Sequence, residues 1–163
     1  MLPFLNGERT PDLPLGKGVL AGLDATNLSP AYIYRAAMEG ATYSLKYGYE
    51  AFLRAGMAFD RIVLTGGGSH SAAWRQLVAD VFGLPVDVPV QAEGAAFGAA
   101  LQALWAWDRA RGSAASIADV ARTHVAIAPS LSTTPDPARR DAYAKAYERF
   151  LHYLDAVTPL QRG

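Results

Sequence analysis

Three consecutive glycines followed by hydroxyl side chains form the segment of the sequence best suited to chemistry. Gly66–Gly68 follows a short apolar run and precedes a helical pattern that begins near Ser71. Without Cβ atoms, a phosphate or a flat nucleobase can approach the backbone closely, and free N–H groups at a helix N-terminus favour negative charge. Ser69 and Ser71 add hydroxyl groups. The pattern predicts a phosphate or nucleotide site, but a turn that only needs unusual backbone angles would use the same glycines.

Other kinds of site fit this sequence less well. The segment lacks the Gly-Lys-Ser/Thr end of a Walker A loop, the G-x-G-x-x-G spacing of a dinucleotide turn and the G-x-S-x-G hydrolase elbow. His70 lies between two serines, but sequence neighbours rarely face each other as the pair that nucleophilic catalysis needs. His124 and His152 lack the spacing of metal ligands, and cysteine is absent. Asp80 and Asp87 are interpreted as a helix-surface and a strand-end residue rather than catalytic carboxylates.

The glycine turn lies within an alternation of strands and helices. Arg61–Thr65 is predicted to be a buried parallel strand, and a helix is predicted from about Ser71 to Phe82, with Gly83 at its end. An edge-like second strand covers residues 84–88, and a third helix runs from Glu93 to about Trp107. This order predicts an α/β fold with right-handed crossovers. Such sheets bind ligands at the carboxyl ends of their strands.

Longer segments flank this alternation. The density of Pro and Gly from Leu2 to Lys17 predicts an ordered loop, and Gly18–Leu23 could form a strand. Ser29 followed by Pro30 predicts a helix start, and nothing stops that helix before about Ala55. Its small residues recur at three- and four-residue spacing, which predicts that another backbone passes close by: Ala37, Gly40, Ala41, Ser44 and Gly48. Towards the end of the chain, a short helix is predicted after Ser116 and an amphipathic helix opens at Asp136.

The composition excludes several classes of partner. Fifteen basic and fifteen acidic side chains balance to a net charge of zero, so no overall field attracts nucleic acid or an anionic membrane. No apolar run approaches the roughly 18 residues that span a bilayer. With 163 residues, of which 51% are hydrophobic, the chain is sufficient for one domain with a sizeable core. We therefore expect a protein that binds neither nucleic acid nor membrane. The absence of cysteine fits a reducing compartment, so we expect the protein in the cytoplasm.

Four segments together resemble the FGGY carbohydrate kinases, a family of the actin, Hsp70 and hexokinase fold superfamily. They are the loop Phe4–Pro11, a signature split between Gly18–Leu23 and Ile33–Gly40, the turn segment Leu64–Gln76 and the helical segment Glu93–Ala100. Tyr32 stands where the signature usually has a polar residue. The likeness extends from Phe4 to about Leu104 and is strongest to the xylulokinase branch of the family.

The resemblance implies a fold, a reaction and a site. The fold is the C-terminal lobe of the actin/Hsp70/hexokinase-like (ribonuclease H-like) type, with residues 1–163 as a partial nucleotide-binding domain and 111–163 as a peripheral connection and C-terminal helix. The implied reaction transfers the γ-phosphoryl group of ATP, with Mg²⁺, to D-xylulose and gives D-xylulose 5-phosphate. Four residues are expected to contact the nucleotide: Gly66, Gly67, Gly68 and Ser71.

The resemblance also implies that much of the enzyme lies elsewhere. Family members are much longer, and they hold the sugar mainly in an N-terminal lobe, with the catalytic aspartate upstream of the segment that begins here. This chain is therefore expected to be a fragment or one half of a split enzyme, with no catalytic residue and no metal ligand. Its expected partners are the missing N-terminal lobe and the sugar, and a homo-oligomer stays open. The alternatives are an inactive nucleotide-binding or regulatory fragment, a kinase for another sugar or polyol, and an actin-like structural protein.

Overall fold

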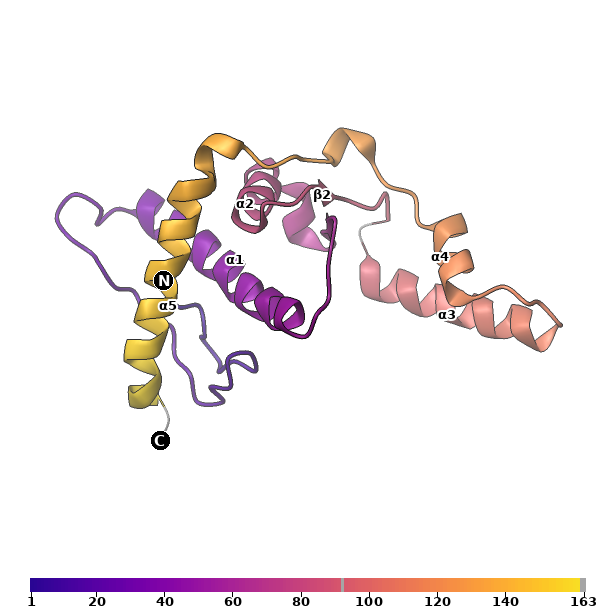
Figure 1. The fold of residues 1–163 in the computed structure, drawn as a ribbon, viewed down its shortest axis with the longest axis horizontal. Helices are drawn as coiled ribbons and strands as arrows, with labels where there is room; N and C mark the ends of the chain where they lie inside the picture. Colours follow the sequence, from indigo (N-terminus) through magenta and orange to yellow (C-terminus); the bar gives the residue numbers. More distant parts are fainter. Residues whose placement is uncertain (92, 162–163) are drawn as a thin grey trace. The chain divides into compact units, whose positions relative to one another are not determined.

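The computed structural model describes residues 1–91 and 93–161. Its elements, in chain order, are α1 (Pro30–Arg54), β1 (Ile62–Val63), η1 (Gly67–His70), α2 (Ala72–Phe82), β2 (Val86–Asp87), α3 (Gly94–Ala110), α4 (Ile117–His124), η2 (Pro129–Leu131), η3 (Pro137–Arg139) and α5 (Arg140–Gln161) (Figure 1). They form two compact units. The helical unit comprises residues 1–59, 80–83 and the chain from Pro135 onward, and the sheet unit comprises residues 60–79 and 84–134.

The long helix α1 of the helical unit is confirmed. Ser29 is its N-cap residue and Pro30 its first residue, a position where the missing N–H of proline costs nothing. The helix ends at Arg54, and Gly56 follows with a φ of +83°. The prediction of a helix from Pro30 to about Ala55 is therefore confirmed to within one residue.

Aromatic side chains join α1 to α5 in the core of the helical unit. The Tyr43 ring lies 5.8 Å from the Tyr147 ring and 5.6 Å from the Phe150 ring, measured between centroids. The Tyr147 hydroxyl donates a hydrogen bond of 3.0 Å to Glu50 on α1. Tyr147, Phe150 and Leu154 are buried at helical spacing, which confirms the amphipathic pattern predicted for this helix.

The N-terminal loop is ordered by backbone hydrogen bonds, as predicted. Leu2 and Val19 exchange bonds of 2.8 and 3.0 Å, as do Glu8 and Leu13, while Phe4 and Leu13 are buried. The strand that Gly18–Leu23 could have formed is absent from the described residues. Val19 makes only a single bridge, to Leu2, and one paired residue does not make a strand.

Gly40 of α1 lies directly against this loop. A Cβ built on Gly40 would lie 2.3 Å from the Met1 carbonyl oxygen, whereas one on Gly48 would meet nothing closer than the Thr10 methyl at 3.9 Å. The small-residue face of α1 thus accommodates another backbone, as predicted, but it does so tightly only at Gly40.

This difference gives a matched pair of variants. We expect Gly40→Ala to lower the free energy of unfolding by about 1–2 kcal/mol, because overpacking outweighs the gain in helix propensity. Gly48→Ala should instead raise it by up to about 1 kcal/mol, since alanine fits there. Thermal denaturation of both variants beside the wild-type protein checks this. Equal midpoints for the two variants would show that the contact with Met1 is not tight.

Asp80 is buried, so its interpretation as a helix-surface residue was wrong. Its side chain is fully inaccessible, and its carboxylate accepts a hydrogen bond of 2.8 Å from the Asp136 backbone N–H and pairs with Arg139 at 3.3 Å. These partners lie 56 and 59 positions further along the chain, which is why the helical pattern around Asp80 did not reveal them. The carboxylate fixes the start of η3 and α5 against the last turn of α2.

The sheet unit contains a small parallel pair of strands. Ile62 of β1 is opposite Val86 of β2, and Val63 is opposite Asp87. Both predicted strands exist, but β1 is only two residues long and Val63 is 49% exposed. The prediction of a buried strand was therefore wrong for β1, because burial on both faces needs layers that the described residues do not supply.

The second strand, β2, is not an edge strand of this unit. On the side away from β1, Val86 exchanges backbone hydrogen bonds of 2.8 and 2.9 Å with Thr133, and Pro89 bridges to Ile127. Residues 127–133 run back along β2 and cover the edge of this strand that was predicted to be free because of Pro85. Asp87 nevertheless lies at the end of the strand, as predicted, where its carboxylate accepts a bond of 2.8 Å from the Ser132 hydroxyl.

Helices α2, α3 and α4 complete the sheet unit. Leu77 and Val78 of α2 are buried, and α3 packs beside α4 (Figure 1). The short helix predicted after Ser116 is α4, which begins with a capping box between Ser116 and Asp119. Hydrogen bonds from Ser116 lower the pKa of the Asp119 carboxyl to about 2.

Candidate functional site

The glycine turn begins where β1 ends. Leu64 still donates a backbone bond of 2.9 Å to Asp87 of β2, and two residues later Gly66 takes a φ of +78°. This left-handed conformation turns the chain into η1, and it suits glycine because a Cβ is strained there. Gly66 therefore has a purely structural reason to be glycine, whatever the turn binds.

Gly67 and Gly68 have no such reason. Neither has a positive φ. A Cβ added to Gly67 would meet no atom within 4 Å, and one on Gly68 would only make an ordinary contact with Trp74 at 3.9 Å. All three glycines are exposed. The first N–H groups of a helical turn have no partner inside it, so the turn offers an open surface of backbone next to a strand end.

The two serines of the turn have different environments. The Ser69 side chain is buried, and its hydroxyl donates a bond of 2.7 Å to the Gly66 carbonyl oxygen. The expectation that Ser69 offers a hydroxyl to a ligand is thus wrong, because that hydroxyl closes the turn. Ser71 is exposed, and its hydroxyl oxygen accepts a bond of 3.3 Å from the Trp74 N–H at the start of α2.

A residue that the sequence did not single out lies beneath the turn. The side chain of Arg75 is directed back to Ser69, whose carbonyl oxygen accepts a bond of 2.7 Å from Nη1 of Arg75. Arg75 is only 8% exposed. Arg75 lies within the segment Leu64–Gln76 that resembles the family, but it was given no role there, although its position one helical turn after Ser71 places it where a helical side chain leans toward the turn.

The N-terminus of α3 lies close to the same strand end. A Cβ on Gly94 would lie 3.1 Å from the Thr65 hydroxyl oxygen, so Thr65 and the first residue of α3 are in close contact. The helix predicted from Glu93 to about Trp107 exists, with Glu93 as its N-cap residue and its end at Ala110. The N-terminus of α3 therefore lies beside the end of β1, and its partial positive charge favours negative charge there.

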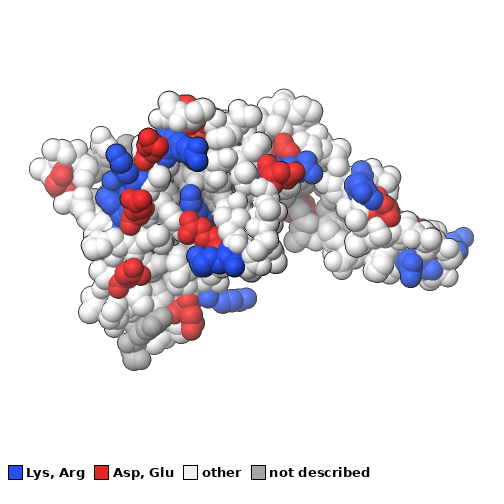
Figure 2. All heavy atoms as spheres, viewed as in Figure 1, with Lys and Arg blue, Asp and Glu red and all other residues white. Residues whose placement is uncertain are grey.

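Other types of site find little support in the part of the chain that the structure describes. It contains no group of three or more His, Asp or Glu side chains placed to hold a metal ion. None of its helices is both long and apolar enough to span a bilayer. Figure 2 shows Lys and Arg interspersed with Asp and Glu over the visible face, in keeping with the balanced composition.

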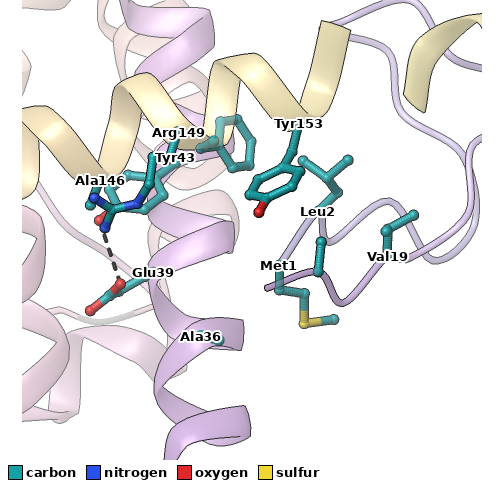
Figure 3. A pocket seen from close by; sticks show the side chains of 11 residues that line it. Met1, Leu2, Val19, Ala36, Glu39, Tyr43, Ala146, Arg149 and Tyr153 are labelled. Carbon is teal, nitrogen blue, oxygen red and sulfur yellow. Dashed lines mark hydrogen bonds between the residues drawn. The ribbon is translucent and has the colours of Figure 1, made fainter. Parts of the chain in front are cut away.

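A separate cavity of about 160 Å³ lies in the helical unit. Figure 3 shows Glu39 and Tyr43 of α1 and Arg149 and Tyr153 of α5 around it. The Tyr43 hydroxyl lies 3.5 Å from a Glu39 carboxylate oxygen, and burial together with that carboxylate raises the pKa of Tyr43. None of the residues predicted for nucleotide binding lines this cavity, so it is not part of the candidate site.

Comparison with known proteins decides the family. Residues 1–107 match the C-terminal domain of the FGGY family of carbohydrate kinases. The chain belongs to this family. The match includes the glycine turn, α2 and most of α3.

Individual relatives agree with this assignment. The chain is 38% identical over 157 residues to a xylulose kinase of Haemophilus influenzae, covering 96% of this chain and 31% of the relative. A crystal structure described as a xyloylose kinase from Brucella ovis is 30% identical, with a TM-score of 0.82, and covers 98% of this chain and 31% of that one. The chain spans about a third of the length of these relatives.

The fold is that of the family, and it does not single out one sugar. A gluconate kinase from Lactobacillus acidophilus, 24% identical, superposes with a TM-score of 0.78 over 96% of this chain and 30% of that protein. The expected fold class, the C-terminal lobe of the actin- and hexokinase-like type, is confirmed by these structures.

Proposed function

We propose that this chain is the nucleotide-binding C-terminal part of a kinase that transfers the γ-phosphoryl group of ATP to D-xylulose. The single observation that carries the nucleotide assignment is the open backbone at Gly67, in a chain that belongs to a family of carbohydrate kinases. The names of two relatives, both xylulose kinases, support D-xylulose as the sugar.

In this proposal the glycine turn seats the phosphates or ribose of ATP. The proposed contacts are Gly66, Gly67, Gly68 and Ser71. A Cβ at Gly67 would occupy space that is open in the structure, so the residues present fit a ligand that lies directly on the backbone. Phosphoryl transfer depends on holding the phosphates in line with the acceptor, and the turn would contribute that positioning.

The Mg²⁺ ion that accompanies ATP also needs ligands. Mg²⁺ is usually held by one or two carboxylates together with substrate phosphates. The described residues contain no group of three or more His, Asp or Glu side chains that could hold a metal ion. We expect Mg²⁺ to arrive with ATP.

The proposed reaction is tested by measuring ADP formation with D-xylulose. The complete product of the gene that encodes this chain should form ADP in a D-xylulose-dependent way. The 163-residue chain alone should show none above background, because the base that deprotonates the acceptor is expected outside it. Turnover with gluconate, ribulose or glycerol but not D-xylulose would overturn the substrate assignment. Turnover by the purified chain alone, after rigorous removal of contaminating kinases, would overturn the proposal that the catalytic base lies outside this chain.

A further inference from the structure

The glycine turn rests on a buried cation. Arg75 is more than nine-tenths buried, and its Nη1 donates to the Ser69 carbonyl oxygen at 2.7 Å. The Nε atom of the same guanidinium is buried and has no hydrogen-bond partner among the described residues. Ser69 in turn donates to the Gly66 carbonyl oxygen at 2.7 Å. Two hydrogen bonds thus connect the guanidinium, through Ser69, to the first glycine of the turn.

No ion pair balances the charge of this arginine within the described parts of the chain. The ion pairs found there involve Arg35, Arg61, Arg122 and Arg139, and none involves Arg75. An arginine keeps its charge at all ordinary pH values, and burying a charge without an opposite partner is unfavourable. The Ser69 carbonyl oxygen accepts a hydrogen bond from the guanidinium but, being neutral, does not balance its charge. An anion seated on the exposed face of the turn would supply the missing negative charge.

We propose that Arg75 is a positioning residue of the nucleotide turn: it holds the turn through Ser69, and its buried charge favours a polyphosphate over an uncharged nucleoside. This inference rests on the proposed nucleotide-binding function and adds a specificity to it. The N-terminus of α3 beside β1 also favours negative charge, but the full charge of a guanidinium in a surrounding of low polarity has a larger effect than the partial charges of a helix end.

The test compares a charged with an uncharged ligand in the complete gene product. Arg75→Gln removes the charge but keeps a hydrogen-bond donor, and Arg75→Lys keeps the charge. Titration calorimetry with ATP and with adenosine gives both affinities for each variant. We expect Arg75→Gln to weaken ATP binding by about tenfold, which corresponds to about 1.4 kcal/mol, with adenosine affinity changed by less than about twofold. Arg75→Lys should retain most of the preference for ATP.

A purely structural role predicts a different outcome. If Arg75 only shapes the turn, Arg75→Gln should weaken ATP and adenosine binding equally, and that result would overturn the inference, as would an unchanged ATP affinity. If Arg75→Gln does not fold, Arg75→Met, which preserves the packing of the side-chain stem, takes its place. Wild-type protein that binds no ATP would overturn the proposed function together with this inference. If the wild-type protein binds ATP and the variants prefer ATP over adenosine as strongly as it does, only this inference is overturned.

Discussion

Valine at Gly67 should weaken ATP binding by the complete enzyme at least tenfold, about 1.4 kcal/mol or more, and should leave its stability nearly unchanged. Gly67 has no positive φ, and a Cβ there meets no atom within 4 Å, so both the backbone angle and the space at the Cβ position allow a side chain. The branched methyl groups would instead fill the open space in which the ribose or a phosphate is proposed to lie. The melting temperature and the ATP affinity, measured on the same preparation, separate the two effects.

Gly83 provides the matched control for this experiment. A Cβ added to Gly83 would likewise meet no atom within 4 Å, but its φ of +68° is one that a side chain disfavours. Gly83→Val should therefore lower the stability by roughly 1–2 kcal/mol without changing ATP affinity. If Gly67→Val instead loses stability while its folded fraction binds ATP with wild-type affinity, the turn is not a nucleotide contact.

Alanine at Asp80 should lower the free energy of unfolding by about 2–3 kcal/mol. The substitution leaves the Asp136 N–H without its acceptor and Arg139 without its buried partner. Because Arg139 is 54% exposed, water compensates part of the lost ion pair, and most of the effect comes from the backbone hydrogen bond.

The neighbouring carboxylate Asp136 gives the comparison for Asp80. It is 41% exposed, and it caps η3 by accepting a hydrogen bond of 3.0 Å from the Ala138 N–H. Asp136→Ala should cost about 0.5–1 kcal/mol, in line with the loss of an exposed helix cap. Urea denaturation of both variants measures the difference. If the Asp80 and Asp136 variants unfold at the same urea concentration, the burial of Asp80 does not increase its contribution to stability.

Local signals in the sequence predicted helices α1 to α5, although the helix expected to open at Asp136 begins at Arg140, after the short η3. Ser29 with Pro30, Ser116 and Gly83 each mark a helix end through chemistry within a few residues, and the structure places a helix boundary beside each of them. The order of strand, glycine turn and helix was likewise visible, because three consecutive glycines after a β-branched run have few other uses. These features need no knowledge of the tertiary structure.

Features that depend on distant partners could not be predicted in this way. The segment Gly18–Leu23 has the composition of a strand, yet it forms none, because a strand exists only where a second segment pairs with it. Asp80 and Arg75 have the same residue types as ordinary surface positions. Their burial depends on Arg139 in one case and on the fold of the turn back over α2 in the other. The sequence was therefore sufficient to predict the exposed backbone of the candidate site, but not the buried side chains beneath it.

The parallel pair of β1 and β2 has one uncovered side, and this has a consequence for handling the chain. The returning segment 127–133 covers β2, whereas among the described residues β1 pairs only with β2. An uncovered strand presents alternate N–H and C=O groups to any extended peptide, and Val63 adds an apolar side chain to that edge. β1 is only two residues long, so this uncovered edge is small. In the isolated chain it is the place where a further strand, from the same protein or from another copy, would pair.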